Sequence, residues 1–435
     1  MKNFNDKFLL SFEKDFNVNY PKNNSATYKS LVNYASDLQI PIQRWYRYKE
    51  GYSINLVDQI LTKYNVKPGD LIVDPFCGSG STLLQSKINK CNSLGFEINP
   101  FSAFLAKVKT QDYKKEDIVY FNKQIIGFKK IKAKQKVCIP KLSTIELLFD
   151  KNALHYLLTL KEKIKQVKNK KVLELFMLVW LSILEESSNY RKAGNGLKVR
   201  KTIKKTTRDQ EYVRNLFFEA AKNIQCDLRF AVDISNKVKT TIIEDTCFNL
   251  GKYTKKGSIK GVIFSPPYAN CFDYTEIYKV ELWMGSFVKE YYDLKTLRKK
   301  GIRSHLNGYE IESKLAVESV PELGFLVNEL SSKKLWDKRI PKMVEAYFND
   351  MFRSITEIHK GLKKGGFCVI IVSNSAYGGV IVPTDLLLAK FAKHLGFNVS
   401  SIDVARNIIT SSQQYKETEK YRKYLRESII YLEKN

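Results

Sequence analysis

One segment near residue 70 restricts the possible fold more than any other part of the chain. Residues 71–73, Leu-Ile-Val, predict a short buried strand, and they lead directly into a loop, 74–82, with the sequence Asp-Pro-Phe-Cys-Gly-Ser-Gly-Ser-Thr. A helix is expected over 82–90, and a second strand over 93–96 ends at Glu97. A strand, a glycine-rich loop, a helix and a strand in this order are typical of the first βαβ unit of a doubly wound α/β sheet.

Elements on both sides of this unit extend the pattern. Apolar residues at helical spacing predict a helix over 53–64, with Ser53 as its N-cap. Later strands are expected at the following positions: 241–243, 261–264, 367–372, 397–404 and 427–432. The fold class is therefore α/β.

Two stretches interrupt the α/β pattern. Residues 111–238 are rich in lysine and mostly helical in period, and a second Lys-rich stretch covers about 285–340. We therefore expect one α/β domain with two insertions. Residues 1–110 contain the first half of the sheet, 111–238 form a largely helical, basic insertion, and 239–435 complete the sheet and carry the second insertion.

The charge balance points to a polyanionic partner. The 435 residues include 73 Lys and Arg against 45 Asp and Glu, a net charge of +28. Nucleic acid is the first candidate partner, and an anionic membrane surface is the second. An AT-rich genome, which enriches Lys, Asn and Ile, is an alternative source of part of this charge. Because 44% of the residues are hydrophobic, overall disorder is excluded.

No segment has the features of a signal peptide or a membrane span. The longest apolar stretch, 172–184, is too short to cross a bilayer and predicts a buried helix. The seven cysteines lie at scattered spacings without a Cys-x-x-Cys pair, and the four histidines form no cluster. We therefore expect reduced thiols, no disulfide framework and no metal site in a cytoplasmic protein.

The glycine loop predicts a nucleoside site. Gly78 and Gly80 lack a Cβ, so the backbone can approach a ligand closely, and an acid at the tip of the next strand, Glu97, suits the hydroxyls of a ribose. The loop has neither the G-x-G-x-x-G spacing of nicotinamide dinucleotide sites nor the Gly-Lys-Ser/Thr of a phosphate-binding P-loop. The alternative is a tight turn that binds no ligand.

The tetrapeptide Ser265-Pro266-Pro267-Tyr268 follows the strand 261–264 directly. Two prolines fix two φ angles and remove two amide donors, so a rigid corner is expected at the carboxyl edge of the sheet, where such sheets bind ligands. A hydroxyl, an unclaimed prolyl carbonyl and the flat face of Tyr268 suit the amine of a planar base. The alternative is a loop that only ends the strand.

These two motifs together resemble the S-adenosylmethionine-dependent DNA amino-methyltransferases, which methylate the N4 of cytosine or the N6 of adenine. The resemblance covers roughly 44–110 and 240–432. It implies a Rossmann-like methyltransferase sheet, mostly parallel with a reversed C-terminal strand, and catalytic residues Ser265, Pro266, Pro267 and Tyr268. It also implies cofactor contacts from the glycine loop, from the second strand end, from an acid after the third strand and from a segment, 44–53, that precedes the first strand. These contacts are Asp74, Pro75, Phe76, Gly78, Gly80, Thr82, Glu97, Ile98, Asn99, Asp245, Tyr52 and Ser53.

Ser265 indicates the target base, since family members with Ser at this position mostly act on cytosine N4. The resemblance implies flipping of that base out of double-stranded DNA, a bacterial, nucleoid-associated location and a restriction–modification system with a cognate restriction endonuclease. Adenine N6, an RNA base, or loss of catalysis in a nucleic-acid binder are the alternatives.

Two cationic stretches are candidates for DNA contacts. Residues 191–208 contain eight cations and no acid, and Gly194 and Gly196 break any helix there, so a flexible loop is expected. Residues 295–303 contain five more cations. The alternative for both is a solvated surface. The side chains expected to contact DNA are Arg191, Lys192, Lys198, Arg200, Lys201 and Arg303.

Overall fold

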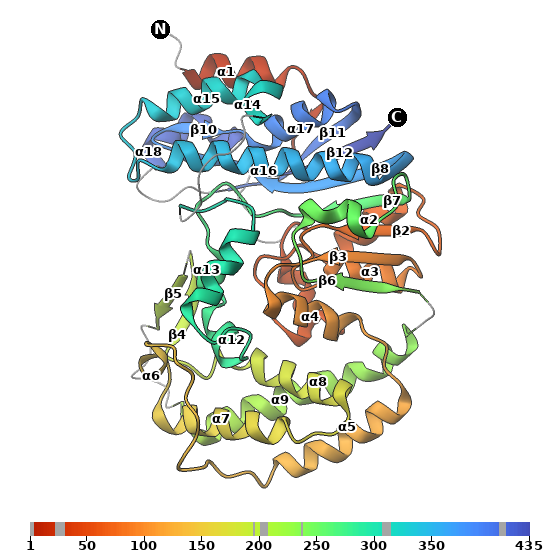
Figure 1. Cartoon of the computed structure of the whole chain (residues 1–435), viewed down its shortest axis with the longest axis vertical. Coiled ribbons are helices and arrows are strands. Elements are labelled where there is room, and N and C mark those ends of the chain that lie inside the picture. The colour runs from red at the N-terminus through yellow and green to blue at the C-terminus, as the bar shows by residue number, and fades with distance from the viewer. Residues whose placement is uncertain are drawn as a thin grey trace.

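The computed structural model describes residues 4–21, 31–194, 196–200, 208–235, 238–306, 315–408 and 415–435. Within these residues, eight strands form one sheet in the order β1-β11-β12-β8-β7-β2-β3-β6 (Figure 1). The strands are β1 (Val18–Asn19), β2 (Leu71–Asp74), β3 (Asn92–Phe96), β6 (Thr240–Ile243), β7 (Ile259–Phe264), β8 (Leu362–Ser373), β11 (Phe397–Asn407) and β12 (Arg426–Lys434). Each of the seven strands expected from the sequence is present, and β1 was not expected.

The sheet is mostly parallel. Strands β6, β3, β2, β7 and β8 pair in parallel, whereas β12 is inserted between β8 and β11 and runs antiparallel to both. The expected fold class, a Rossmann-like sheet with a reversed C-terminal strand, is confirmed. Because the parallel strands point the same way, the loops that follow β2, β3, β6 and β7 meet at one edge.

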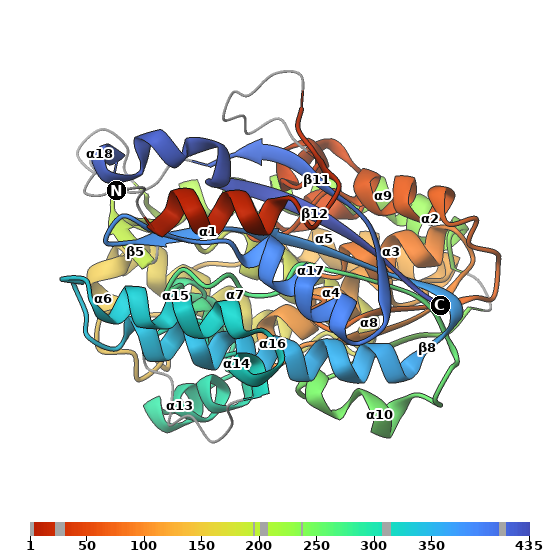
Figure 2. The same ribbon diagram turned by 90° about the horizontal axis from the view of Figure 1, so that it is seen from above.

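Helices cover both faces of the sheet, as strict alternation along β8 shows. Phe367, Val369 and Ile371 pack toward α2 (Ile54–Lys63), while Cys368 and Ile370 pack toward α16 (Ile340–Gly361) on the opposite face. Helix α17 (Thr384–His394) lies beside α16 and covers β11 and β12 (Figure 2). The strand is buried on both faces, which explains its continuous apolar sequence.

A largely helical insertion follows β3 and lies at one end of the molecule (Figure 1). Stacked phenylalanines, among them Phe121 and Phe176, give it a core of its own. The apolar stretch expected as a buried helix is α8. The helices from β3 to β6 are α4 (Pro100–Thr110), α5 (Lys115–Phe128), α6 (Ile145–Leu148), α7 (Lys151–Ile164), α8 (Lys170–Ser182) and α9 (Gln210–Asp233).

The stretch that begins at residue 191 was expected to be a flexible loop, and the structure shows a β-hairpin in its described part. Its described part forms an antiparallel hairpin of β4 (Tyr190–Ala193) and β5 (Gly196–Val199), with Gly194 in the left-handed region at φ 59°. The glycines that exclude a helix permit the turn of a hairpin instead.

The remaining elements of the described chain are short. In the described residues, no helix is both long and apolar enough to span a membrane. The remaining helices and strands are α1 (Phe4–Glu13), α3 (Ser81–Ile88), α10 (Leu250–Tyr253), α11 (Tyr274–Ile277), α12 (Lys279–Met284), α13 (Tyr291–Lys300), α14 (Leu315–Ser319), α15 (Pro321–Ser331), β9 (Ser375–Tyr377), β10 (Val380–Val382) and α18 (Tyr415–Thr418).

Candidate active site

A cavity of about 330 Å³ opens at the carboxyl ends of the parallel strands. Its walls include the glycine loop, the residues after β3, β6 and β7, and part of the segment before α2. The contributing stretches are 48–52, 75–79, 96–99, 245–247 and 265–268. Motifs that are about 190 residues apart in the sequence, in the glycine loop and in the Ser-Pro-Pro-Tyr loop, therefore face the same space.

Left-handed backbone shapes the glycine loop. Gly78 has φ 49° and lines the cavity, and Gly80 has φ 89° at the N-terminus of α3. A Cβ on Gly80 would lie 3.0 Å from the Cβ of Ala106, so this glycine allows α3 and α4 to approach each other. A Cβ on Gly78 would lie 3.1 Å from the Tyr48 ring, at the cavity wall.

Glu97 is fixed by backbone donors. Its Oε2 accepts a hydrogen bond from Gly78 N at 2.9 Å, and its Oε1 accepts one from Asn99 N at 2.8 Å. Burial raises the pKa of this carboxyl to about 7, against the lowering effect of the two amides. The side chain of Asn99 serves a second purpose, since its Oδ1 caps α4 by accepting from Phe101 N.

Some residues that were predicted to contact the cofactor form hydrogen bonds that hold the glycine loop in place. The buried Asp74 carboxylate accepts hydrogen bonds from Tyr52 Oη at 2.9 Å and Phe76 N at 3.0 Å, and Tyr52 also contacts the Thr82 hydroxyl. Asp74, Gly80 and Thr82 lie outside the lining of the cavity, and their direct contact with the cofactor stays a prediction. Tyr52 itself lines the cavity.

Ser53 also lies outside the lining of the cavity, and its contact with the cofactor stays a prediction. It caps α2, as expected, by accepting from Asn55 N, and its hydroxyl donates to Asp37 at 2.7 Å. Ser53 is fully buried and outside the cavity lining, because the cap requires its side chain to turn toward the helix. The expected cofactor residues that do line the cavity are Tyr52, Pro75, Phe76, Gly78, Glu97, Ile98, Asn99 and Asp245.

The Ser265-Pro266-Pro267-Tyr268 loop forms another part of the cavity wall. The Ser265 hydroxyl donates to Tyr268 Oη at 3.3 Å, and Tyr268 Oη donates to Glu427 at 2.5 Å. Burial raises the pKa of Tyr268 well above its usual value, so the phenol keeps its proton. All four residues of the tetrapeptide contact the cavity, as expected from the sequence.

The structure adds residues that were not among the individually named cofactor contacts. Glu50 lines the cavity and accepts a hydrogen bond from Tyr278, and Tyr278 stacks on Tyr48 with centroids 5.2 Å apart. Burial raises the pKa of Glu50. The preceding residues are tied to the helical insertion, because Asp227 of α9 accepts from Ile42 N and from the indole of Trp45. Contacts with residues far away in the sequence, Tyr278 and Asp227, therefore fix the positions of Glu50 and of the residues before it.

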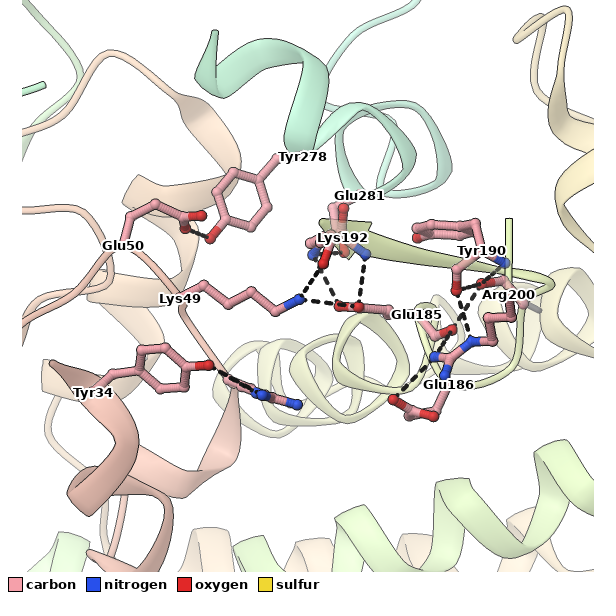
Figure 3. Close-up of polar contacts among 12 residues, drawn as sticks. Tyr34, Lys49, Glu50, Glu185, Glu186, Tyr190, Lys192, Arg200, Tyr278 and Glu281 are labelled. Carbon is pink, nitrogen blue, oxygen red and sulfur yellow. Dashed lines mark hydrogen bonds and ion pairs between the residues drawn. The ribbon is translucent and has the colours of Figure 1, made fainter. Parts of the chain in front are cut away.

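The expected DNA contact of Lys192 is corrected by its environment (Figure 3). Its side chain is 2% exposed and pairs with Glu281, itself 1% exposed, at 2.5 Å. Lys49 reaches the same cluster and donates to the Lys192 carbonyl and to Glu185. Lys192 thus joins the hairpin to α12, and it is not available to a phosphate.

Other expected DNA contacts differ in accessibility. Arg200 donates to the carbonyls of Tyr190 and Glu185 and pairs with Glu186 at 3.1 Å (Figure 3). Arg303 pairs with Asp350 at 2.7 Å. Arg191 and Lys198, which are opposite each other on the hairpin, are exposed, whereas Lys201 lies outside the described residues.

Comparisons with known proteins agree on one family. A family model described as DNA methylase, covering N6 and N4 enzymes, matches residues 15–108. The Type II methyltransferase M.BsoBI of Geobacillus stearothermophilus is 28% identical over 98% of this chain and 92% of its own length. Type II methyltransferase M.AvaI of Nostoc is 25% identical over 86% of this chain and 83% of its own, and M.MvaI of Kocuria varians is 22% identical over 74% of each.

The matched segment of the family model contains the glycine loop and Glu97, and the M.BsoBI alignment spans nearly all of the chain. The glycine loop and Glu97 line the same cavity as the Ser-Pro-Pro-Tyr loop. These matches support the assignment of the chain to the amino-methyltransferase family of DNA methylases.

Proposed function

We propose that the protein transfers a methyl group from S-adenosyl-L-methionine to the exocyclic N4 of a cytosine flipped out of double-stranded DNA. The observation that supports this most strongly is the shared cavity of the Glu97 wall and the Ser265 wall. A methyl donor on one wall and a base on the other would be in direct contact. Transfer in a single displacement needs this proximity and no covalent intermediate with the enzyme.

The residues of the first wall fit the proposed cofactor. Both Glu97 oxygens are oriented by amides, and each retains a lone pair for a ribose hydroxyl. Gly78 leaves open the space that a Cβ would occupy beside Tyr48. Asp245, fixed by Thr246 N and by Asn249, offers a carboxylate for an adenine amine. When bound, S-adenosyl-L-methionine supplies an electrophilic methyl group.

The second wall would activate the base. The cytosine amine is a weak nucleophile because its lone pair is delocalised into the ring. Hydrogen bonds from this amine to Ser265 Oγ and to the Pro266 carbonyl favour a pyramidal nitrogen with a localised lone pair. The face of Tyr268 would stack on the flipped base, worth about 1–3 kcal/mol, which offsets part of the cost of unstacking.

The hairpin supports binding of duplex DNA at the cavity mouth. Strand β5 contacts α11, and Tyr274 and Thr275 of α11 line the cavity. The exposed cations Arg191 and Lys198 therefore lie on a hairpin that contacts part of the cavity wall. Phosphate contacts there would place the duplex with a base near Ser265.

Adenine N6 is the second candidate target, since the matching family includes N6 and N4 enzymes and the same acceptors suit either amine. The relatives are named Type II methyltransferases, so we propose a protective role beside a cognate restriction endonuclease.

A methyl-transfer assay tests the proposal. Unmethylated bacteriophage DNA, which offers many sequence contexts, is incubated with the protein and tritiated S-adenosylmethionine. We expect label in the DNA, and a loss of about 10²–10³-fold in turnover for Ser265→Ala, the scale for an oriented catalytic hydrogen-bond partner. Ser400→Ala, on a serine outside the cavity lining, is the matched control. Equal turnover in Ser265→Ala and wild type would contradict the assigned role.

A further inference from the structure

Glu427, on the C-terminal strand, contacts the Ser-Pro-Pro-Tyr wall and is paired with Arg406 of the neighbouring strand. The Tyr268 hydroxyl donates to Glu427 Oε1, and Glu427 Oε2 accepts from Arg406 Nε at 2.5 Å. Ser265 donates to Tyr268, so hydrogen bonds connect Ser265, Tyr268, Glu427 and Arg406 in series. Glu427 and Arg406 both line the cavity, yet neither belongs to a motif that the sequence reveals.

The reversed strand explains this placement. Arg406 of β11 and Glu427 of β12 are paired partners in the antiparallel ladder, beside an irregularity between Val404 and Arg406. Glu427 is also opposite Ser373 of β8, so its side chain is positioned close to the end of β7, where Ser265 begins its loop. The Glu427 side chain is 4% exposed and that of Arg406 is 18% exposed. A buried carboxylate needs such a partner, since an unpaired one is costly.

The direction of the hydrogen bonds matters for Ser265. Its single proton is committed to Tyr268, because Tyr268 in turn gives its proton to the carboxylate. Both lone pairs of the serine oxygen then remain available, and a chain of hydrogen bonds ending on a charge increases their acceptor strength. The Ser265–Tyr268 distance of 3.3 Å is long for two hydroxyls, as is common for catalytic hydrogen bonds before substrate binds.

We propose that Glu427, held by Arg406, is a positioning residue that acts through the Tyr268 hydroxyl to make Ser265 a pure hydrogen-bond acceptor for the target amine. This inference rests on the proposed function. It gives Tyr268 two separate functions, since the ring face stacks on the base and the hydroxyl orients Ser265. A stacking function alone needs no hydroxyl, so phenylalanine would serve equally well.

The substitution Tyr268→Phe separates these two functions. It keeps the ring and removes the hydroxyl, and we expect kcat for methyl transfer to fall about 10–100-fold, less than for direct loss of an oriented partner, with KM for DNA changed by less than about twofold. Tyr431→Phe removes a hydroxyl from β12 outside the cavity and should behave as wild type. A kcat for Tyr268→Phe equal to wild type would overturn the inference.

The substitution Glu427→Gln tests the second link. It should lower kcat, and the double variant with Tyr268→Phe should be no slower than Tyr268→Phe alone, because both changes interrupt one series of hydrogen bonds. Glu433→Gln, on the same strand and outside the cavity lining, is the matched control. Independent, multiplying losses in the double variant would show that Glu427 acts elsewhere.

A spectroscopic readout separates this inference from the proposed function. In protein labelled with ¹³Cζ-tyrosine, the Tyr268 resonance is identified by its loss in Tyr268→Phe. It should shift in Glu427→Gln and not in Glu433→Gln, because the phenol donates to Glu427. If wild type transfers no methyl group but the resonance shifts, the proposed function fails and the contact stands. If the resonance does not shift, the inference fails regardless of activity.

Discussion

Removal of the Glu97 carboxylate should weaken binding of S-adenosylmethionine by about a hundredfold or more. Each carboxylate oxygen is oriented by one backbone amide, at 2.8 Å and 2.9 Å, and is aimed at the cavity. Hydrogen bonds to charged groups contribute about 1.5–3 kcal/mol each, so removing the partner of two ribose hydroxyls in Glu97→Ala corresponds to about 3 kcal/mol at the low end. Every 1.4 kcal/mol is about a tenfold change in Kd.

The pH dependence follows from the same environment. Burial raises the pKa of Glu97 to about 7 in the free protein, and in the proposed complex the ribose hydroxyls would donate to its charged form. Affinity should therefore be fully present above pH 7 and decline as pH falls through 7, by roughly tenfold between pH 8 and pH 6. Glu97→Ala should lose this slope. Any slope that remains belongs to the α-amino group of the ligand, which titrates near pH 8.

Isothermal titration calorimetry at pH 6, 7 and 8 measures both effects. Glu244→Gln, which changes an exposed acid next to Asp245, is the control for the loss of one charge. Thermal melting verifies that each variant is folded. A folded Glu97→Ala protein with unchanged Kd, or a wild-type Kd independent of pH, would refute the assignment of Glu97 to the ribose.

Three further perturbations test other parts of the structure. Gly80→Ala should lower the free energy of unfolding, measured in urea, by more than Gly69→Ala does. Both glycines have a positive φ, near 89° and 86°, but only the Cβ added at position 80 would meet α4, at 3.0 Å. Equal losses in the two variants would contradict the tight approach of α3 and α4. Arg191→Ala with Lys198→Ala should weaken DNA binding and reduce the log–log salt slope by about 0.9 for each phosphate that the protein no longer neutralises, and an unchanged slope would contradict the binding of DNA by the hairpin. Burial lowers the pKa of Lys109 to about 7, so above pH 7 the unfolded chain binds one more proton than the folded chain. The free energy of unfolding should therefore rise with pH from 7 to 9, by at most about 1.4 kcal/mol per pH unit, relative to that of Lys109→Met. Parallel curves of unfolding free energy against pH for the two proteins would contradict this prediction.

The sheet and the two motif loops could be predicted from the sequence because their signals are local. Continuous apolar runs marked the strands buried on both faces, and glycine and proline marked loops whose backbone geometry depends on those residues. Ser53 received two predictions from the sequence, a helix cap and a cofactor contact, and the structure confirms the cap. Its position as a helix cap was visible in the sequence, and that signal correctly describes its contacts.

Side chains whose environment depends on distant partners could not be predicted. Lys192 looked like part of a cationic loop, but its partner Glu281 is 89 residues away. Alternation along β4, where Tyr190 and Lys192 are buried and Arg191 is exposed, is the period-two signal that could have indicated a strand. Glu427 is 159 residues from Tyr268, and only the insertion of β12 between β8 and β11 brings the two together.

The identity of the methylated base tests the central claim most directly. DNA methylated by the wild-type protein is digested to nucleosides, which are separated and identified by mass spectrometry, with Ser265→Ala as the inactive control. Ser265, a residue found at this position mostly in the cytosine-N4 enzymes that the chain resembles, leads us to expect N4-methylcytosine as the sole new nucleoside. N6-methyladenine without N4-methylcytosine would contradict the proposed target base, and no methylated nucleoside from any DNA would contradict the proposed function itself.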